Sequence, residues 1–252
     1  MNNISEFKHE MIKYGLKSDK IFEHNYHIIY SLYLHRFKES KNSIVEIGIL
    51  NGDSGNMWLN LLPNMYFYGV DILHEPIKTD RYEIIKADQS KKEDLLRIKE
   101  TINKKVDIII DDGSHIPEHQ ILTFNVLFPK LEKGGVYIIE DIETSYWTKG
   151  NIYNYETNYG IDNKMNLINI FQKVNHNINY NIWKHNEKTS EKYKEFRKTE
   201  IDTEILDNIE SVTFSRNCII ITKKEDFEKI EGVHYVNEDY LNLEYKLKQY
   251  VD

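Results

Sequence analysis

Short apolar runs alternate with amphipathic stretches along the first 147 residues, and this alternation predicts the architecture. The apolar runs have the β-branched composition of strands and fall at residues 43–49, 65–71, 82–86, 106–111 and 135–140. The stretches at residues 55–62, 91–103 and 118–131 have the spacing of helices. Strands that alternate with helices form a parallel sheet with helices on both faces, and nearly continuous apolar runs suit strands buried on both sides. We therefore expect an α/β fold that is Rossmann-like and doubly wound.

The segments that flank this core follow other patterns. Residues 1–40 carry an approximate 3.6-residue apolar stripe and are expected to be helical. Residues 148–206 are rich in Tyr, Asn, Lys and Glu and contain one helix-like run at 165–174. We interpret this region as an insertion that caps the sheet.

The C-terminal part indicates two more strands, at residues 211–223, joined by a tight turn near Arg216 and Asn217. These strands bring the mostly parallel sheet to seven, and the charged last thirty residues indicate a helix. We expect a single domain, 1–252, with four parts: N-terminal helices (1–40), the core (41–147), the cap insertion (148–206), and the final strands with a C-terminal helix (207–252).

Composition narrows the class of protein. The 252 residues carry 41 acidic and 33 basic side chains, for a net charge of -8, and the lysines are spread among acids. Nucleic acid is therefore an unexpected partner, because binding through phosphates needs a concentrated basic face. The single cysteine, Cys218, excludes an intrachain disulfide and a cysteine-rich zinc site. With no apolar run of about 20 residues and no apolar stretch typical of a signal peptide, we expect a cytoplasmic protein.

The ends of the first three strands favour a nucleoside ligand, because ligands of parallel sheets bind beyond the carboxyl ends of the strands. The first strand leads through Glu46 and Gly48 to Ser54, and the second ends at Asp71, an acid suited to ribose hydroxyls. Asp88 follows the third strand, where it could meet an exocyclic amino group or cap the next helix.

The spacing of this loop argues against a dinucleotide. The pyrophosphate-binding loop has its second glycine two residues after the first, and here that position is Leu50. An adenosine that carries a compact sulfonium and amino-acid tail fits better. We assign to the cofactor-binding set Glu46, Gly48, Ser54, Asp71, Asp88 and, at the end of the fourth strand, Asp111. A plain turn after the first strand is the alternative.

Acidic residues gather at the ends of the fourth and fifth strands. Asp112 follows the fourth strand, with His115 three residues later, and Glu140 and Asp141 end the fifth. Ends of adjacent strands lie about 5 Å apart, so the three carboxylates should converge and need a compensating cation. Oxygen ligands suit Mg²⁺, and a neutral imidazole at His115 could accept a proton from a hydroxyl. Helix capping and structural histidines are the alternatives, and His119 is a second candidate base.

With these segments in view, the chain resembles class I S-adenosylmethionine-dependent methyltransferases, and more closely the metal-dependent sugar O-methyltransferases of macrolide tailoring. The similar segments are residues 44–58, 69–72, 87–90 and 107–147, and more loosely 18–30. The resemblance implies that Glu46, Gly48, Asp71 and Asp88 hold S-adenosylmethionine. It implies Mg²⁺ on Asp112, Glu140 and Asp141, and His115 as general base.

The resemblance also gives the flanking parts roles. It implies that residues 1–40 form a lid, in which Asp19, Lys20, His24 and Tyr26 fold over the cofactor. Catechol O-methyltransferases are similar in placing the base three residues after the first metal carboxylate, although their base is Lys. We expect no counterpart of the large N-terminal extension of the macrolide enzymes, so their assembly need not transfer; a homodimer or larger homo-oligomer is expected.

The expected function is Mg²⁺-dependent methyl transfer from S-adenosylmethionine to a sugar hydroxyl, on a nucleotide sugar or a glycan precursor of polysaccharide biosynthesis. A vicinal diol suits the metal, and the tyrosines of the cap region with Trp183 could form a platform for the sugar. The alternatives are a catechol or small-phenol O-methyltransferase, an NAD-dependent oxidoreductase, a non-catalytic S-adenosylmethionine binder, and a nucleic-acid amino methyltransferase. The missing GxGxxG loop and the acidic cluster argue against the oxidoreductase.

Overall fold

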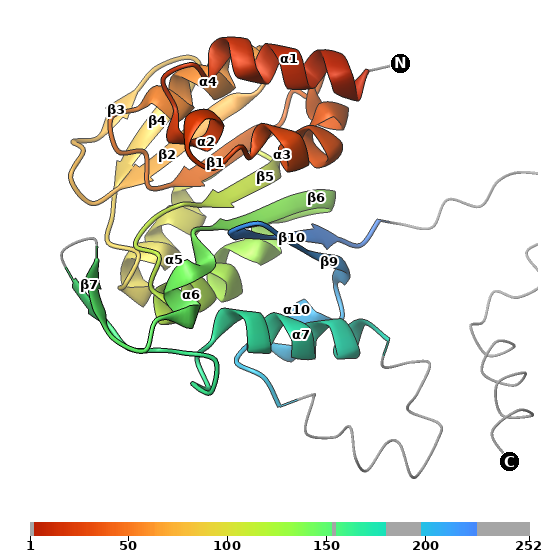
Figure 1. The fold of residues 1–252 in the computed structure, drawn as a ribbon. Helices are drawn as coiled ribbons and strands as arrows, with labels where there is room; N and C mark the ends of the chain where they lie inside the picture. The colour runs from red at the N-terminus through yellow and green to blue at the C-terminus, as the bar shows by residue number, and fades with distance from the viewer. Residues whose placement is uncertain (1–2, 153–154, 180–197, 226–252) are drawn as a thin grey trace, which may run out of the picture.

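The computed structural model describes residues 3–152, 155–179 and 198–225, which form a sheet between two helical layers (Figure 1). The sheet has eight strands in the order β3-β4-β2-β1-β5-β6-β10-β9. Its strands are β1 (Ser43–Ile47), β2 (Tyr66–Asp71), β3 (Ile77–Lys78), β4 (Tyr82–Lys86), β5 (Val106–Asp111), β6 (Leu131–Glu140), β9 (Ile209–Ser215) and β10 (Cys218–Lys223). The α/β, mostly parallel, doubly wound fold expected from the sequence is confirmed.

The expected strand count of seven was wrong, because an eighth strand adds to one edge. Strand β3 pairs antiparallel with β4 through Ile77 and Lys78 only. Such a strand is too short to leave an apolar run, and both of its residues are exposed. The five strands of the core otherwise match the expected runs to within a few residues, and the turn between β9 and β10 lies at Arg216 and Asn217 as expected.

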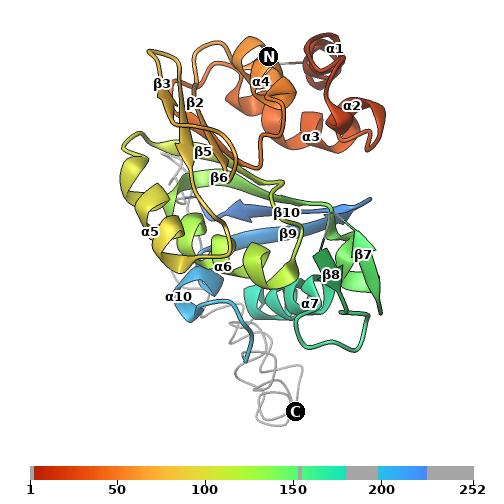
Figure 2. The ribbon, with the colours of Figure 1, turned by 90° about the vertical axis from the view of Figure 1, so that its left-hand side faces the viewer.

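The helices divide between the two faces (Figure 2). One face carries α1 (Ile4–Tyr14), α2 (Asp19–Phe22), α3 (His27–Leu34) with the short η1 (His35–Phe37), and α4 (Asp53–Leu61). The other carries α5 (Lys92–Thr101), α6 (Pro117–Leu127) with η2 (Phe128–Lys130), α7 (Leu167–Ile178) and α10 (Thr203–Leu206). The remaining elements are η3 (Ile142–Tyr146) and the hairpin of β7 (Gly150–Ile152) and β8 (Tyr155–Thr157).

Alternate residues of each central strand enter two separate hydrophobic clusters. Ile109 of β5 packs toward α5, α6 and α7, whereas its neighbours Ile108 and Ile110 pack toward α1, α3 and α4. All three side chains are fully buried. Because both faces are covered, strands in this position are apolar throughout, as the sequence pattern indicated.

The segments before β1 and after β6 contain the expected helices where the structure describes them. The N-terminal stripe forms three helices instead of one continuous run, with breaks at Gly15 and at Asn25, whose φ is 56°. The helix expected at residues 165–174 is α7, which starts after Asn166. Trp183 and the expected C-terminal helix lie outside the described residues. Within the described part, no helix is long and apolar enough to cross a membrane.

The order in which strands are added to the sheet reverses between β1 and β5. From β1 it proceeds to β2 and β4 on one side, and from β5 to β6 on the other. A crevice at such a switch point, outside the carboxyl ends of the strands, is where open α/β sheets bind ligands. The residues that follow β1, β5 and β6 are therefore the ones that build the site.

Candidate active site

Glu46 is held inside the protein at the end of β1. Its side chain is fully buried, and it accepts hydrogen bonds from the Ser54 hydroxyl at 2.7 Å and the Trp58 indole at 3.3 Å. The ammonium of Lys20 lies 3.3 Å from the same carboxylate. Glu46 and Ser54, both predicted to bind cofactor, are thus joined to each other and to the N-terminal helices.

Gly48 allows the loop after β1 to lie against the loop after β5. Its φ is 81°, and a Cβ built on it would lie 2.1 Å from the carbonyl oxygen of Asp112. The Asp112 N–H in turn donates to the carbonyl of Ile47 at 2.9 Å. Glycine at this position therefore allows the backbone of Gly48 to approach the backbone of Asp112, the candidate cation ligand.

Asp71 and Asp88 both fasten the backbone near their strand ends. The Asp71 carboxylate accepts hydrogen bonds from the N–H groups of Ile49 at 3.2 Å and Leu73 at 2.8 Å, one on each oxygen. Asp88 accepts from the N–H and hydroxyl of Ser90, and these hydrogen bonds lower its pKa to about 2. Both side chains stay partly exposed, which leaves oxygen lone pairs open to a ligand.

Asp111 lies deeper than the other predicted cofactor residues. Its side chain is fully buried and accepts hydrogen bonds from Gln89 at 2.5 Å and Tyr137 at 3.3 Å. The Gln89 carbonyl then accepts from the Ser114 N–H at 2.8 Å. Burial raises the pKa of Asp111 to about 7. From this position Asp111 orients the loop that leads to His115.

Lys20 stands at the centre of the acidic cluster. It projects from α2 and is fully buried. Its ammonium donates to Asp112 at 2.5 Å and to both oxygens of Glu140, at 2.8 and 2.9 Å. The sequence indicated that Lys20 folds over a cofactor; in the structure its partners are the carboxylates at the ends of three strands.

Two tyrosines of the N-terminal helices complete these contacts. Tyr30 donates to Glu140 at 2.5 Å, and Tyr26 donates to Asp141 at 2.9 Å. Asn217, in the turn between β9 and β10, also donates to Asp141 at 2.9 Å. The rings of Tyr26 and Tyr30 stack at 5.4 Å between centroids. The carboxylates after β6 are therefore oriented by segments about 110 and 76 residues away in the chain.

Asp112, His115 and Asp141 form a second group beside Lys20. One ligand atom from each lies within 4.8 Å of the others, and the His115 Nε2 is 3.8 Å from Asp141. His115 and Asp141 both have left-handed backbone angles, with φ of 57° and 51°. Such strain persists only where the surroundings enforce it, and it is common at functional sites. The Thr144 hydroxyl donates to the His115 carbonyl at 2.6 Å and holds this loop.

The electrostatics of the cluster leave room for a cation. Burial raises the pKa of Glu140, and the neighbouring Asp112 raises it further, against the effect of Lys20. Burial acts to lower the pKa of Lys20, but its three acidic neighbours outweigh this effect and raise it. Three carboxylates share the Lys20 ammonium, and Asp141 lies 3.7 Å from His24 and 3.8 Å from His115, so bound protons or a second cation must compensate the remaining negative charge. The oxygen-rich group at Asp112 and Asp141 fits Mg²⁺.

Sequence reasoning missed several residues that shape this site. Tyr30 was assigned only to an apolar stripe, and Gln89 and Asn217 were not singled out as site residues. Asn217 did carry a signal, since an asparagine in a tight turn adopts positive φ, here 57°. For Tyr30 and Gln89 the sequence offers none, because their partners are distant in the chain. His119, the second candidate base, instead pairs with Ser114 at 2.9 Å.

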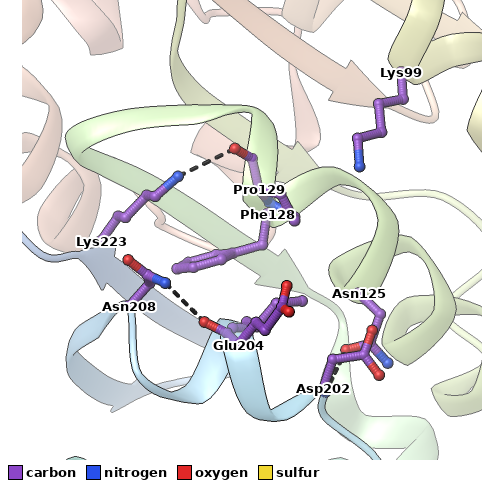
Figure 3. A pocket seen from close by; sticks show the side chains of 9 residues that line it. Lys99, Asn125, Phe128, Pro129, Asp202, Glu204, Asn208 and Lys223 are labelled. Carbon is purple, nitrogen blue, oxygen red and sulfur yellow. Dashed lines mark hydrogen bonds between the residues drawn. The ribbon is translucent and has the colours of Figure 1, made fainter.

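Two hollows in the described part of the chain lie away from this cluster. One, of about 440 Å³, lies between η2, α10 and the end of β10 (Figure 3). Two of its polar side chains bond to nearby backbone: Lys223 donates to the Pro129 carbonyl and Asn208 to the Glu204 carbonyl. A second hollow lies along α7. Neither is lined by a carboxylate of the cluster.

Comparison with known proteins gives relatives in one functional group, although no family model matches the chain. The chain is 37% identical over 138 residues to the 8-demethyl-8-alpha-L-rhamnosyl tetracenomycin-C 2'-O-methyltransferase of Streptomyces olivaceus, covering 52% of this chain and 36% of that protein. It is 35% identical over 126 residues to the mycinamicin VI 2''-O-methyltransferase of Micromonospora griseorubida, covering 47% and 31%. The chain thus spans about a third of the length of the curated relatives it matches.

Solved structures agree on the fold. The mycinamycin-pathway methyltransferase MycE, solved with Mg, S-adenosylhomocysteine and mycinamycin VI, matches with a TM-score of 0.67 and 23% identity, covering 89% of this chain and 56% of that one. A second crystal form, with Mg and S-adenosylhomocysteine, matches with a TM-score of 0.69. The resemblance expected from the sequence is therefore confirmed: over about half of its length the chain is similar to sugar O-methyltransferases that act on antibiotic glycosides, and its fold is the Rossmann-like fold of MycE.

Proposed function

We propose that this chain transfers a methyl group from S-adenosylmethionine to a sugar hydroxyl of a glycosylated small molecule, with His115 as general base. The observation that carries the proposal is the convergence of His115, Asp112 and Asp141 at one point, next to the glycine loop after β1. The named relatives act on sugars attached to antibiotics, which favours a glycoside over the polysaccharide precursor expected from the sequence. A nucleotide sugar stays the alternative acceptor.

The cofactor side is proposed along the loop from Gly48 to Ser54 and at Asp71 and Asp88. Gly52, with φ 81°, opens α4 and leaves the first N–H groups of that helix unpaired within it. The half-buried Asp71 retains acceptor capacity for ribose hydroxyls beyond its two backbone contacts. Glu46 and Asp111 are fully buried, so their role toward the cofactor is to fix the loops that surround it.

The cation side is proposed at Asp112 and Asp141. A bound Mg²⁺ supplies Lewis-acid chemistry, which lowers the pKa of a hydroxyl that it contacts. Tyr26 and Asn217 hold one oxygen of Asp141 and leave the other, Oδ2, directed at His115. The carboxylate of Asp112 is shared between this group and Lys20.

His115 is placed to accept the proton of the sugar hydroxyl. As the hydroxyl oxygen forms its bond to the methyl carbon, the carbon–sulfur bond breaks and the proton passes to the imidazole, leaving S-adenosylhomocysteine. Asp141, 3.8 Å from the imidazole, stabilises the positive charge that His115 then carries. The Thr144 contact and the left-handed backbone hold the main chain of His115 in place before substrate arrives.

The first test is a calorimetric titration of S-adenosylhomocysteine into the purified chain, with NADH as the parallel titrant. We expect micromolar binding of S-adenosylhomocysteine and none of NADH. A Mg²⁺-dependent methyl-transfer screen then compares rhamnosylated polyketides, nucleotide sugars and catechols as acceptors. Failure of S-adenosylhomocysteine to bind, with and without Mg²⁺, would overturn the proposal; turnover confined to catechols would retain the chemistry and reject the sugar.

A further inference from the structure

Tyr146 is an exposed aromatic side chain at the edge of the sheet where the site lies. It ends η3, the 3₁₀-helix that begins directly after Asp141. Its side chain is 53% exposed, whereas the preceding Thr144 and Ser145 are fully buried. A 3₁₀-helix rises about 2.0 Å per residue, so five residues place Tyr146 about 10 Å from Asp141 along the helix. A ligand of the size of one sugar, held at His115, can therefore reach the tyrosine ring.

The backbone that carries Tyr146 is held from two sides. The Thr144 hydroxyl donates to the His115 carbonyl at 2.6 Å, which ties η3 to the loop of the proposed base. The Ser145 carbonyl accepts from the side-chain amide of Asn166 at 2.5 Å, and Asn166 is fully buried. Residues that act on a ligand are positioned best when the residues supporting them are fixed by packing and hydrogen bonds. Tyr146 is thus an exposed ring on a rigid support.

The fold itself does not use the polar and aromatic groups of Tyr146. Among the residues that the structure describes, its hydroxyl has no hydrogen-bond partner and its ring has no stacking partner. Tyr159, from the cap region where the sequence suggested a sugar platform, differs, because its hydroxyl donates to Glu118 at 2.5 Å. A single exposed aromatic residue is common on protein surfaces, so the position of Tyr146 beside the base decides its role.

The order of the strands puts Tyr146 on the acceptor side of the site. The cofactor is proposed along the loop after β1 and at the ends of β2 and β4, and His115 follows β5. Strand β6, which leads into η3, lies on the side of β5 away from β1. In-line methyl transfer requires the acceptor oxygen to approach the methyl carbon from the side opposite to the sulfur. The acceptor therefore reaches His115 from the side of β6 and η3.

We propose that Tyr146 is a specificity-determining residue that stacks its ring on the apolar face of the acceptor sugar. This inference rests on the proposed function and names the surface that holds the sugar. One face of a deoxyhexose ring exposes mainly C–H groups, and a tyrosine offers a large, rigid aromatic face at low cost in conformational entropy. Ligand sites combine such surfaces with a few polar groups that fix orientation, and His115 is the polar group here.

The test measures methyl transfer by the full chain, with Mg²⁺, to a rhamnosylated polyketide, a nucleotide-linked rhamnose and a catechol. For a methylated sugar, we expect Tyr146→Ala to raise KM about tenfold and to leave kcat within about threefold. Tyr146→Phe keeps the ring and should stay within about threefold of the unmodified chain in KM. Tyr146→Leu keeps apolar area without an aromatic face and should resemble Tyr146→Ala. Tyr14→Ala, which removes another exposed tyrosine, is the matched control and should change neither constant.

Binding of S-adenosylhomocysteine separates this inference from the proposed function. Every variant should bind it as the unmodified chain does, because Tyr146 lies on the acceptor side; a matching loss of this affinity would indicate a structural role and overturn the inference. An unchanged KM for the sugar in Tyr146→Ala would overturn the inference alone, and so would a raised KM that Tyr146→Leu restores. Turnover of neither sugar, or of the catechol only, would reject the sugar methylation and this inference with it.

Discussion

Gly48 and Gly52 offer a matched pair for testing the contact that joins the two loops of the site. Both have φ of 81°, so alanine meets the same backbone strain at either position. A Cβ at Gly48 would lie 2.1 Å from the carbonyl oxygen of Asp112 and 2.7 Å from its carbonyl carbon, whereas a Cβ at Gly52 meets nothing within 4 Å. The two substitutions therefore differ only in the clash.

The magnitude follows from these distances. The left-handed backbone costs an alanine about 1–2 kcal/mol at either position, and the stiffer unfolded chain offsets about 0.4–1 kcal/mol of that. At Gly48 the loops must also separate by about 1 Å to restore ordinary contact. They resist, because the Asp112 N–H is bonded to Ile47 at 2.9 Å and the Gly48 N–H to Val70 at 2.8 Å. We expect Gly48→Ala to be about 1–3 kcal/mol less stable than Gly52→Ala.

Urea unfolding followed by circular dichroism measures this difference in the free energy of unfolding. A Mn²⁺ titration of the folded variants adds a second measurement, because the displaced loop carries Asp112; we expect weaker binding for Gly48→Ala alone. Equal free energies for the two variants would refute the reasoning, since they would mean that the loops separate without cost and do not fix Asp112.

Three further outcomes are expected. His115→Ala should lower turnover about 10²–10⁴-fold with nearly unchanged S-adenosylhomocysteine affinity; near-normal turnover would reject His115 and turn attention to His119. The hydrogen bonds from Ser90 lower the pKa of Asp88 to about 2, so its carboxylate stabilises the fold above the unfolded pKa near 4 and loses this effect as pH falls toward 2. Asp88→Asn should then be less stable in urea at pH 7 by about 0.5–1 kcal/mol, with the difference shrinking between pH 4 and pH 2; a difference independent of pH would contradict this. Burial raises the pKa of the Cys218 thiol to about 12, so a thiol reagent should label it no faster than the chain unfolds, and rapid labelling of the native protein would contradict its burial.

The sequence by itself determined most of the sheet and which acids lie at its strand ends. Strands buried on both faces must be apolar at every position, so the runs around Ile109 and Ile138 could be recognised as strands from the sequence. The acids that follow these runs, Asp112, Glu140 and Asp141, stand at strand ends because local sequence fixes where a strand stops. In a parallel sheet the carboxyl ends of all strands lie at the same edge. The closeness of these acids therefore follows from their positions at successive strand ends.

Only the tertiary structure decided which charge each acid faces. Lys20 is 92 residues from Asp112 and 120 from Glu140, and no local pattern relates them. Their pairing depends on how the N-terminal helices pack over the strand ends, which is set by burial of the apolar faces of those helices. The same packing excludes water, which makes each charge depend on its neighbours. Strand-end position could thus be predicted from one sequence, whereas the pairing of Lys20 with these acids emerged only from the folded chain.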